Sequence, residues 1–165
     1  MSVILIGMPS CGKSTLGVLL AKKLGYRFID SDLVIQEREG ALLHDIIEQR
    51  GREGFLKIEN DVNCSINDSG AVISTGGSAV YGKEAMEHLG SLGKVVYLYI
   101  SYDTMVSRLG DYVHRGVVLP EGGTLEDMYR ERSDLYEKYA DITVDVEKQD
   151  ISQCLEQIRR QIVQN

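Results

Sequence analysis

The fold is decided by one stretch near the N-terminus, Gly7-Met8-Pro9-Ser10-Cys11-Gly12-Lys13-Ser14-Thr15. It fits the pattern G-x-x-x-x-G-K-[ST], a loop whose backbone N–H groups surround phosphate groups. An apolar run at residues 2–6 precedes this P-loop, and leucines at helical spacing follow it until Gly25. A strand, a glycine-rich loop and a helix form the context that the motif needs. The alternative, a plain glycine turn between strand and helix, does not account for the whole pattern.

The P-loop residues divide into backbone and side-chain contributors. Gly7 and Gly12 let the backbone turn its N–H groups inward, and the following helix adds a partial positive charge. Lys13 is expected to reach the β and γ phosphates as a catalytic residue, and the Ser14 hydroxyl can ligate Mg²⁺. Cys11 is either part of the phosphate site or an ordinary loop residue. The residues that we expect to bind nucleotide here are Gly7, Ser10, Cys11, Gly12, Lys13, Ser14 and Thr15.

Composition limits the class of protein. The chain has 165 residues, 43% of them hydrophobic, and a formal net charge of −7. This predicts a single domain over residues 1–165 and argues against binding to nucleic acid or to an acidic membrane. Three cysteines, far apart, form no disulfide framework or metal-ligand spacing. With no signal peptide and no apolar run long enough to span a membrane, we expect a cytoplasmic protein, and we expect a monomer.

Strands and helices alternate along the chain. Apolar, β-branched runs predict strands at residues 2–6, 26–30, 71–74, 94–100 and 142–146, with helical patterns between them. The fold class is therefore α/β, a parallel sheet with helices on both faces. Ligands of such sheets lie at the carboxyl ends of the strands. Residues 110–124 are rich in glycine, lack apolar periodicity and are typical of a long, mobile loop.

Two further motifs follow predicted strands. Asp30 and Asp32 suit a magnesium site and the orientation or deprotonation of an acceptor hydroxyl. Alternatively, they and Ser31 only cap the next helix. Gly76 and Gly77 allow the backbone to approach an acceptor closely, or form a plain turn.

Arginines stand where a lid would carry them. Phosphoryl transfer to a small molecule requires water to be excluded, and a lid loop at about 110–124 serves this purpose. Arg108 and Arg115 flank the loop, and Arg132 lies on the helix that follows. Each guanidinium can bind phosphate or carboxylate through two parallel hydrogen bonds. The alternative is that they are ordinary surface arginines.

Together these motifs resemble the shikimate kinase family, P-loop enzymes similar to nucleoside-monophosphate kinases. The resemblance runs from Met1 to about Ile158. It implies a three-layer P-loop fold with a five-stranded parallel sheet of order 2-3-1-4-5, acceptor-binding helices at about 31–61 and a lid loop. The stretches that carry it are Gly7–Thr15, Phe28-Ile29-Asp30-Ser31-Asp32, Ser74-Thr75-Gly76-Gly77-Ser78, Arg115, and Glu131-Arg132-Ser133-Asp134-Leu135-Tyr136.

The resemblance also implies residue roles. Asp32 contacts the acceptor hydroxyls and is the candidate base, while Asp30 lies in the magnesium shell. Arg132 binds the substrate carboxylate, Arg115 bridges phosphate and substrate from the lid, and Arg108 packs on adenine.

Four positions depart from the family pattern. The arginine of the family's F-R-x-x-E is Leu56, the third glycine of its glycine triplet is Ser78, its G-E is Gly51-Arg52, and its R-P-L-L is Arg115-Gly116-Val117-Val118. Arg52 or Lys57 could replace the missing charge, but we expect neither to share a helical face with position 56. Shikimate would then be held largely by one arginine.

The sequence therefore predicts a kinase that uses ATP and Mg²⁺ to phosphorylate a small hydroxylated acid, above all the 3-hydroxyl of shikimate. A diverged kinase for another small alcohol remains open, as does a non-catalytic nucleotide-binding regulator. The intact Lys13, Ser14, Asp30 and Asp32 argue against the regulator.

Overall fold

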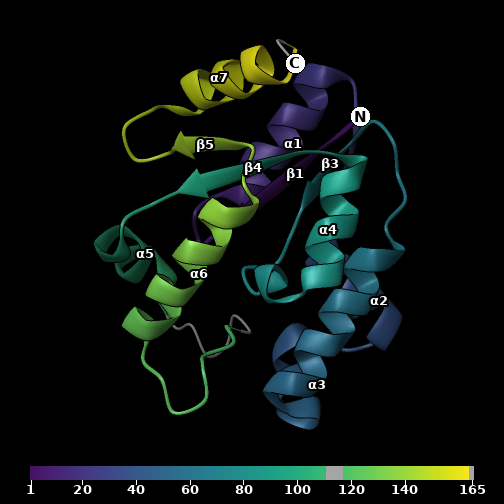
Figure 1. The fold of residues 1–165 in the computed structure, drawn as a ribbon, viewed down its shortest axis with the longest axis vertical. Coiled ribbons are helices and arrows are strands. Elements are labelled where there is room, and N and C mark those ends of the chain that lie inside the picture. The colour runs from purple at the N-terminus through teal and green to yellow at the C-terminus, as the bar shows by residue number, and fades with distance from the viewer. Residues whose placement is uncertain (111–116, 164–165) are drawn as a thin grey trace.

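A computed structural model describes residues 1–110 and 117–163 of the chain, and Figure 1 shows its fold. All five predicted strands are present, and each of their bounds differs from the prediction by one residue at most. The strands are β1 (Ser2–Gly7), β2 (Arg27–Asp30), β3 (Ala71–Ser74), β4 (Gly93–Tyr99) and β5 (Ile142–Asp145). The helices are α1 (Lys13–Leu24), α2 (Ser31–Glu39), α3 (Leu43–Ser65), the 3₁₀ turn η1 (Ala79–Tyr81), α4 (Lys83–Leu92), α5 (Tyr102–Leu109), α6 (Leu125–Tyr139) and α7 (Ile151–Val163).

The strands form one parallel sheet in the order β2-β3-β1-β4-β5, which confirms the predicted fold class and strand order. β1 lies at the centre, where Ile4 pairs with Ile73 of β3 and with Val95 of β4. Every residue of β1 is buried, as expected for a strand covered on both faces. The chain therefore reaches the P-loop from the most tightly held part of the sheet.

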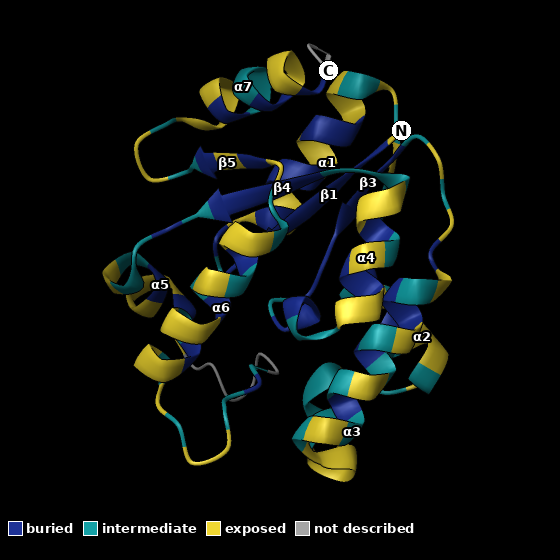
Figure 2. Ribbon diagram, viewed as in Figure 1, coloured by how far each residue is buried: buried dark blue, intermediate teal, exposed yellow. Residues whose placement is uncertain are grey.

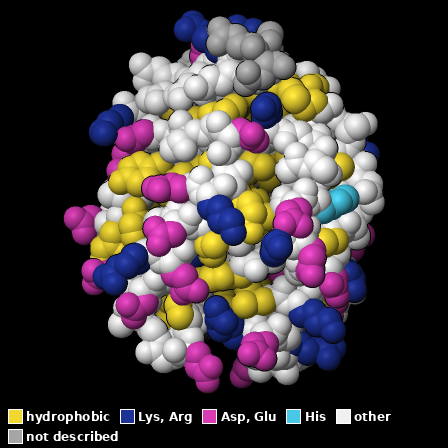
Figure 3. Space-filling model, in the orientation of Figure 1, with side chains coloured by type: hydrophobic (Ala, Val, Ile, Leu, Met, Phe, Trp, Pro, Cys, Tyr) yellow, Lys and Arg dark blue, Asp and Glu magenta, His cyan; other side chains and the backbone are white. Residues whose placement is uncertain are grey.

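Helices cover both faces of the sheet. α1 and α7 lie together on one side, while α4 and α6 pack on the other (Figure 1). The strands appear in dark blue between these two helical layers in Figure 2, where the main apolar core runs from Val3 to Ile162. On the face shown in Figure 3, acidic and basic side chains are interspersed around smaller apolar patches.

α2 and α3 extend from one end of the sheet and enclose a second, smaller apolar cluster. Gly51 breaks α3 with φ 68° and ψ 177°, a conformation that favours glycine, so α3 consists of two helical segments. The cluster joins both halves of α3 to α2 and to the loop before α6. Its buried members are Ile35, Ile46, Phe55, Val62 and Val118.

The loop between α5 and α6 is described only in part. Residues 111–116, which include Arg115, lie outside the described residues. Residues 117–124 contain no helix or strand, in agreement with the predicted loop, and Val118 is buried in the second apolar cluster. The mobility of this loop stays a prediction. The assignment of residues 1–165 to one domain also stays a prediction.

One of the capping candidates named from the sequence caps α2. Asp30, not Ser31, is the N-cap: its carboxylate accepts a hydrogen bond from the backbone N–H of Asp32 at 3.1 Å. Ser31 is already helical and buried, and its hydroxyl accepts a hydrogen bond from the N–H of Gly76 at 3.3 Å. A capping residue is extended and has a free side chain, whereas the Ser31 side chain already bonds to the turn after β3.

Along the described chain, no helix is long and apolar enough to cross a membrane.

A substitution at Gly93 would test how closely β1 and β4 approach each other. A Cβ atom there would overlap the backbone of Ser2, whereas a Cβ at exposed Gly90 of α4 would meet only Val95, at 4.0 Å. We expect Gly93→Ala to lower the free energy of unfolding by about 1–3 kcal/mol through overpacking. Gly90→Ala should leave it unchanged or raise it by up to about 1 kcal/mol, because alanine favours helix. Urea unfolding measures both, and equal stabilities would contradict the described pairing.

Candidate active site

The P-loop has a backbone conformation suited to an anion. Gly7 has φ 148°, and a Cβ atom there would lie 2.6 Å from the carbonyl oxygen of Leu98 on β4. Gly12 has φ 99° and Ser10 has φ 64°, so the loop turns through left-handed conformations between them. Gly12 is the N-cap of α1 and makes no side-chain cap, which leaves the first N–H groups of the helix for a ligand.

Lys13 is buried against the loop that it follows. Its ammonium group donates hydrogen bonds to the carbonyl oxygens of Gly7 at 2.8 Å and Met8 at 2.9 Å. The Cys11 sulfur lies 3.8 Å from the same nitrogen and is buried in the core. The lysine thus places a positive charge inside the loop, next to the uncapped start of α1.

The predicted magnesium ligands lie side by side. The Ser14 hydroxyl on α1 donates a 2.7 Å hydrogen bond to the Asp30 carboxylate at the end of β2. A hydroxyl and a carboxylate are oxygen donors that Mg²⁺ uses when phosphate and water fill its other positions. The described residues contain no group of three His, Cys, Asp or Glu side chains that could hold a metal by itself. The pair therefore fits a cation that arrives with a phosphate.

A cavity of about 270 Å³ opens beside the P-loop, near the lower end of the range for small-molecule sites. It brings together most of the predicted phosphate and acceptor residues. The cavity wall is formed by the P-loop, the turn after β3, α3 and the loop before α6. Asp32 and Arg132 complete it. The lining side chains are Pro9, Ser10, Gly12, Lys13, Ser14, Thr15, Asp32, Leu43, Phe55, Glu59, Thr75, Gly76, Gly77, Ser78, Val117, Val118 and Arg132.

The glycines after β3 are needed for a close approach. A Cβ atom at Gly76 would overlap Glu59 Oε1 and lie 2.7 Å from Asp32 Oδ1, and one at Gly77 would lie 2.9 Å from Arg132 Nη1. The Tyr136 hydroxyl donates a 2.6 Å hydrogen bond to the carbonyl oxygen of Gly77. The turn is thus more than a plain turn, because its glycines let charged side chains of the protein itself converge at the cavity.

Glu59 is a site residue to which the sequence assigned no role. Its side chain is 1% exposed, and Oε2 accepts a 2.6 Å hydrogen bond from the Ser78 hydroxyl while Oε1 has no partner. Burial raises the pKa of Glu59 to about 7, against the lowering effect of Ser78. Ser78 in place of a third glycine therefore has a physical reason: it supplies a donor to this carboxyl group.

Asp32 faces the same cavity and is also hard to ionise. Desolvation first, and then the charge of Asp30, raises the pKa of Asp32 to about 6, while Lys13 acts in the opposite direction. A carboxylate with a pKa slightly below neutral is mostly ionised at pH 7 and still basic enough to take a proton.

Arg132 is not a surface arginine. Its side chain is 1% exposed, it donates a hydrogen bond to the carbonyl oxygen of Val118, and its Nε has no partner. Its guanidinium lies over the ring of Tyr81, with Cζ 5.4 Å from the ring centroid. α6 thus presents a buried cation to the cavity.

A second cavity, of about 280 Å³, lies on the other side of the P-loop. Exposed Arg108 lines it together with Cys11, Gly12 and Thr15, while other lining residues come from the segment between β5 and α7. The predicted adenine-packing arginine is therefore beside the loop. Arg115, the other lid arginine, falls outside the described residues.

Comparison with known proteins identifies the family to which the chain belongs. The sequence model of the family "Shikimate kinase" matches residues 9–163. This chain belongs to the shikimate kinase family. A shikimate kinase from Sulfurihydrogenibium sp. is 33% identical over 98% of the chain and 97% of the relative's length. One from Actinobacillus pleuropneumoniae is 40% identical over 90% and 87%. The predicted activity, phosphoryl transfer to an alcohol group, is confirmed through this membership.

Solved structures agree with the family assignment. A shikimate kinase from Acinetobacter baumannii, in complex with shikimate, superposes with a TM-score of 0.87 at 30% identity. The match covers 99% of this chain and 93% of that protein. The predicted shikimate kinase fold is thereby confirmed.

The departure at Leu56 needs a correction to our expectation for Arg52. Both residues lie in the part of α3 after Gly51 and are four positions apart, so they share a side of the helix. Leu56 packs against the second apolar cluster. Arg52 lies against the Tyr81 ring, at 5.3 Å from its centroid. Lys57 is exposed, as expected for a residue that does not share this face.

Glu59 links the site to the pH dependence of stability. Between about pH 4.5 and 7 the folded state holds a proton on Glu59 that the unfolded chain releases, so stability falls as pH rises. Glu59→Gln removes this loss. We expect its free energy of unfolding, relative to the parent protein, to rise by about 1–3 kcal/mol from pH 5 to pH 8.

Urea unfolding at both pH values measures the difference, and Glu53→Gln, at an exposed position of the same helix, is the control. A Glu59→Gln difference that is the same at pH 5 and pH 8 would mean that Glu59 is already ionised in the folded protein.

Proposed function

We propose that this chain transfers the γ-phosphoryl group of ATP to the 3-hydroxyl of shikimate. One observation carries the proposal: the P-loop, the carboxyl group of Asp32 and the buried guanidinium of Arg132 line the same cavity. The three groups match the three parts of the reaction: a phosphate donor, a hydroxyl acceptor and a carboxylate handle on the acceptor. The shikimate-bound relative from Acinetobacter baumannii supports the choice of acceptor.

On the acceptor side, Arg132 binds the carboxylate through charge-assisted hydrogen bonds. The ring hydroxyls then point toward Asp32, which orients the reacting hydroxyl and accepts its proton as the new O–P bond forms. The bond between the γ phosphorus and the bridging oxygen breaks, and ADP leaves. Gly76 and Gly77 keep the floor of the cavity free of side chains, so the acceptor lies between Asp32 and Arg132.

On the donor side, the P-loop N–H groups and Lys13 hold the phosphates in line with the acceptor. Ser14 and Asp30 fit a Mg²⁺ ion, which would neutralise charge on the phosphates. Arg108 packs on the adenine in the second cavity, and Arg115 acts from the lid. Positioning of this kind accounts for most of the rate enhancement in phosphoryl transfer.

The partner of the reaction is a small molecule, and we propose that the protein works as a monomer in the cytoplasm. Its three cysteines are free, which suits a reducing compartment. A second acceptor, another small alcohol that is uncharged where shikimate carries its carboxylate, is favoured by a single observation: Leu56 takes the place of an arginine in the family pattern. Steady-state kinetics with a panel of hydroxylated acids and polyols separates the two.

The first test is ADP release coupled to a spectroscopic assay, with shikimate and the panel as acceptors. We expect shikimate to give the highest kcat/KM. Lys13→Ala should lower kcat by at least a hundredfold, because it removes a charge that stabilises the transferring phosphoryl group. Lys22→Ala, at an exposed position on α1, is the matched control. Near-normal turnover of Lys13→Ala would refute the phosphate site.

The second test uses pH. A base must be unprotonated, so kcat/KM for shikimate should fall about tenfold per unit below pH 6, the pKa that burial imposes on Asp32. Asp32→Asn should lower kcat and remove this limb of the profile. Asp61→Asn, an exposed carboxyl on α3, should keep it. A profile that is unchanged in Asp32→Asn would assign the limb to another group.

A further inference from the structure

Two arginines from different helices share one aromatic ring. Arg52 of α3 and Arg132 of α6 place their Cζ atoms 5.3 and 5.4 Å from the centroid of Tyr81 in η1. The two guanidinium carbons therefore lie within about 11 Å of each other. Like charges repel at such distances in a poorly solvated site. Their convergence on one ring needs a reason.

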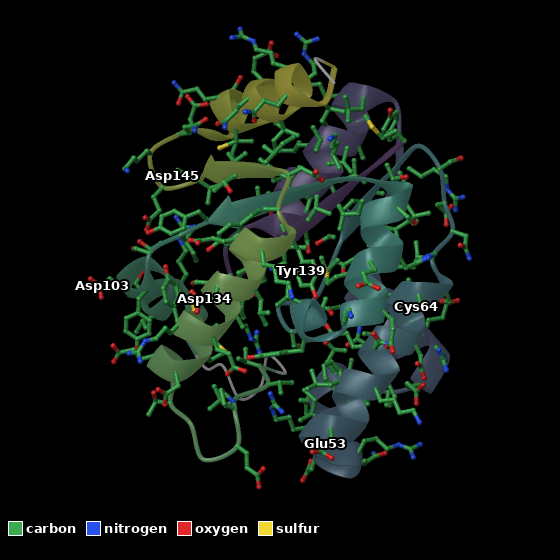
Figure 4. All side chains as sticks on the ribbon, viewed as in Figure 1. Glu53, Cys64, Asp103, Asp134, Tyr139 and Asp145 are labelled. Carbon is green, nitrogen blue, oxygen red and sulfur yellow. The ribbon has the colours of Figure 1, made fainter. Side chains whose placement is uncertain are left out.

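Both guanidinium groups carry a buried donor without a partner. Nε of Arg52 and Nε of Arg132 are inaccessible to solvent, and neither donates a hydrogen bond in the described structure. Among the described residues, no carboxylate lies within ion-pair distance of either side chain, and the attraction between Arg132 and Glu59 only partly offsets the rise that burial causes in the pKa of Glu59. The neighbouring Glu53 lies at the outer end of α3, where its side chain is exposed (Figure 4). Two buried cations beside one ring, each with an unpartnered donor, are costly, and an anion near both would offset this cost.

Arg52 lies on the face of α3 that also carries two residues of the cavity wall. Arg52, Phe55 and Glu59 are spaced i, i+3 and i+7 after the break at Gly51, so they share one face of the helix. Phe55 and Glu59 line the cavity, as does Arg132 from the opposite helix. Arg52 thus stands at the end of this row, beside Tyr81.

We propose that Arg52 is a substrate-binding residue that determines specificity, and that it holds the acceptor carboxylate together with Arg132. The inference rests on the proposed function, since that function supplies the carboxylate. Tyr81 orients both forks through cation–π contacts, and the carboxylate accepts hydrogen bonds from the terminal N–H groups of the two guanidinium ions. A small hydroxylated acid is bound in this way, and an uncharged polyol of the same shape is not.

A purely structural role is the competing explanation. Arg52 could stack on Tyr81 only to hold η1 and the turn before it. Its loss would then weaken the fold and affect every acceptor equally. Binding of a carboxylate instead changes the KM for charged acceptors alone, so the two roles are separable by kinetics.

The test compares Arg52→Gln with Lys57→Gln, an exposed change on the same helix. We expect Arg52→Gln to raise the KM for shikimate at least tenfold, with kcat changed less than threefold and the KM for ATP unchanged. Arg52→Lys, which keeps the charge but not the planar fork, should lie between Arg52→Gln and the parent. Lys57→Gln should match the parent in all three constants.

Shikimate methyl ester, tested as a competitive inhibitor, separates the two roles, because loss of a structural Arg52 would weaken its binding as much as that of shikimate. Its inhibition constant should differ less than threefold between the parent and Arg52→Gln, because the ester lacks the charge. An unchanged KM for shikimate, or equal weakening of shikimate and its ester, would overturn the role of Arg52. Absence of shikimate turnover in the parent protein would instead refute the proposed function.

Discussion

The parallel pairing of β1 with both β3 and β4 is the constraint on which the rest of the structure depends. It brings the carboxyl ends of three strands to one edge, so the P-loop and the turn after β3 lie side by side. The N–H and the hydroxyl of Thr75 both donate to the carbonyl oxygen of Leu5, which ties that turn to β1 itself. The phosphate half and the acceptor half of the site are therefore built on one strand.

This edge holds an unusual concentration of buried charge. Lys13, Asp32, Glu59 and Arg132 line one cavity, two cations against two carboxyl groups. Desolvation disfavours ionisation of both carboxyls, and the cations only partly offset it. Such a cluster reduces stability in the free protein, as functional sites commonly do. In return, the groups are already oriented when the substrates arrive.

The sequence predicted the fold because its decisive features are local. A strand, the P-loop and α1 are contiguous, and the remaining strands are short apolar runs between glycines. The strand order came from the family resemblance, since periodicity does not determine it. Glu59 as a buried acid and Tyr81 beside two arginines were missed. Each depends on contacts between distant segments, and η1, which carries Tyr81, is too short to leave a periodic pattern.

Leu56 shows why a motif and a site are different things. A motif specifies which residue type stands at each sequence position, whereas a binding pocket requires a charged group at a given position in three dimensions. On a helix, a residue four positions earlier lies on the same side one turn away, and an arginine side chain is long enough to extend over that distance. Leu56 meanwhile packs against the apolar cluster that joins α3 to α2 and to Val118. Exchanging an arginine for leucine at 56 therefore adds to that cluster, while Arg52 leaves a cation near Tyr81. The departure from the family pattern therefore leaves a guanidinium group on this side of α3, over the same Tyr81 ring that Arg132 contacts.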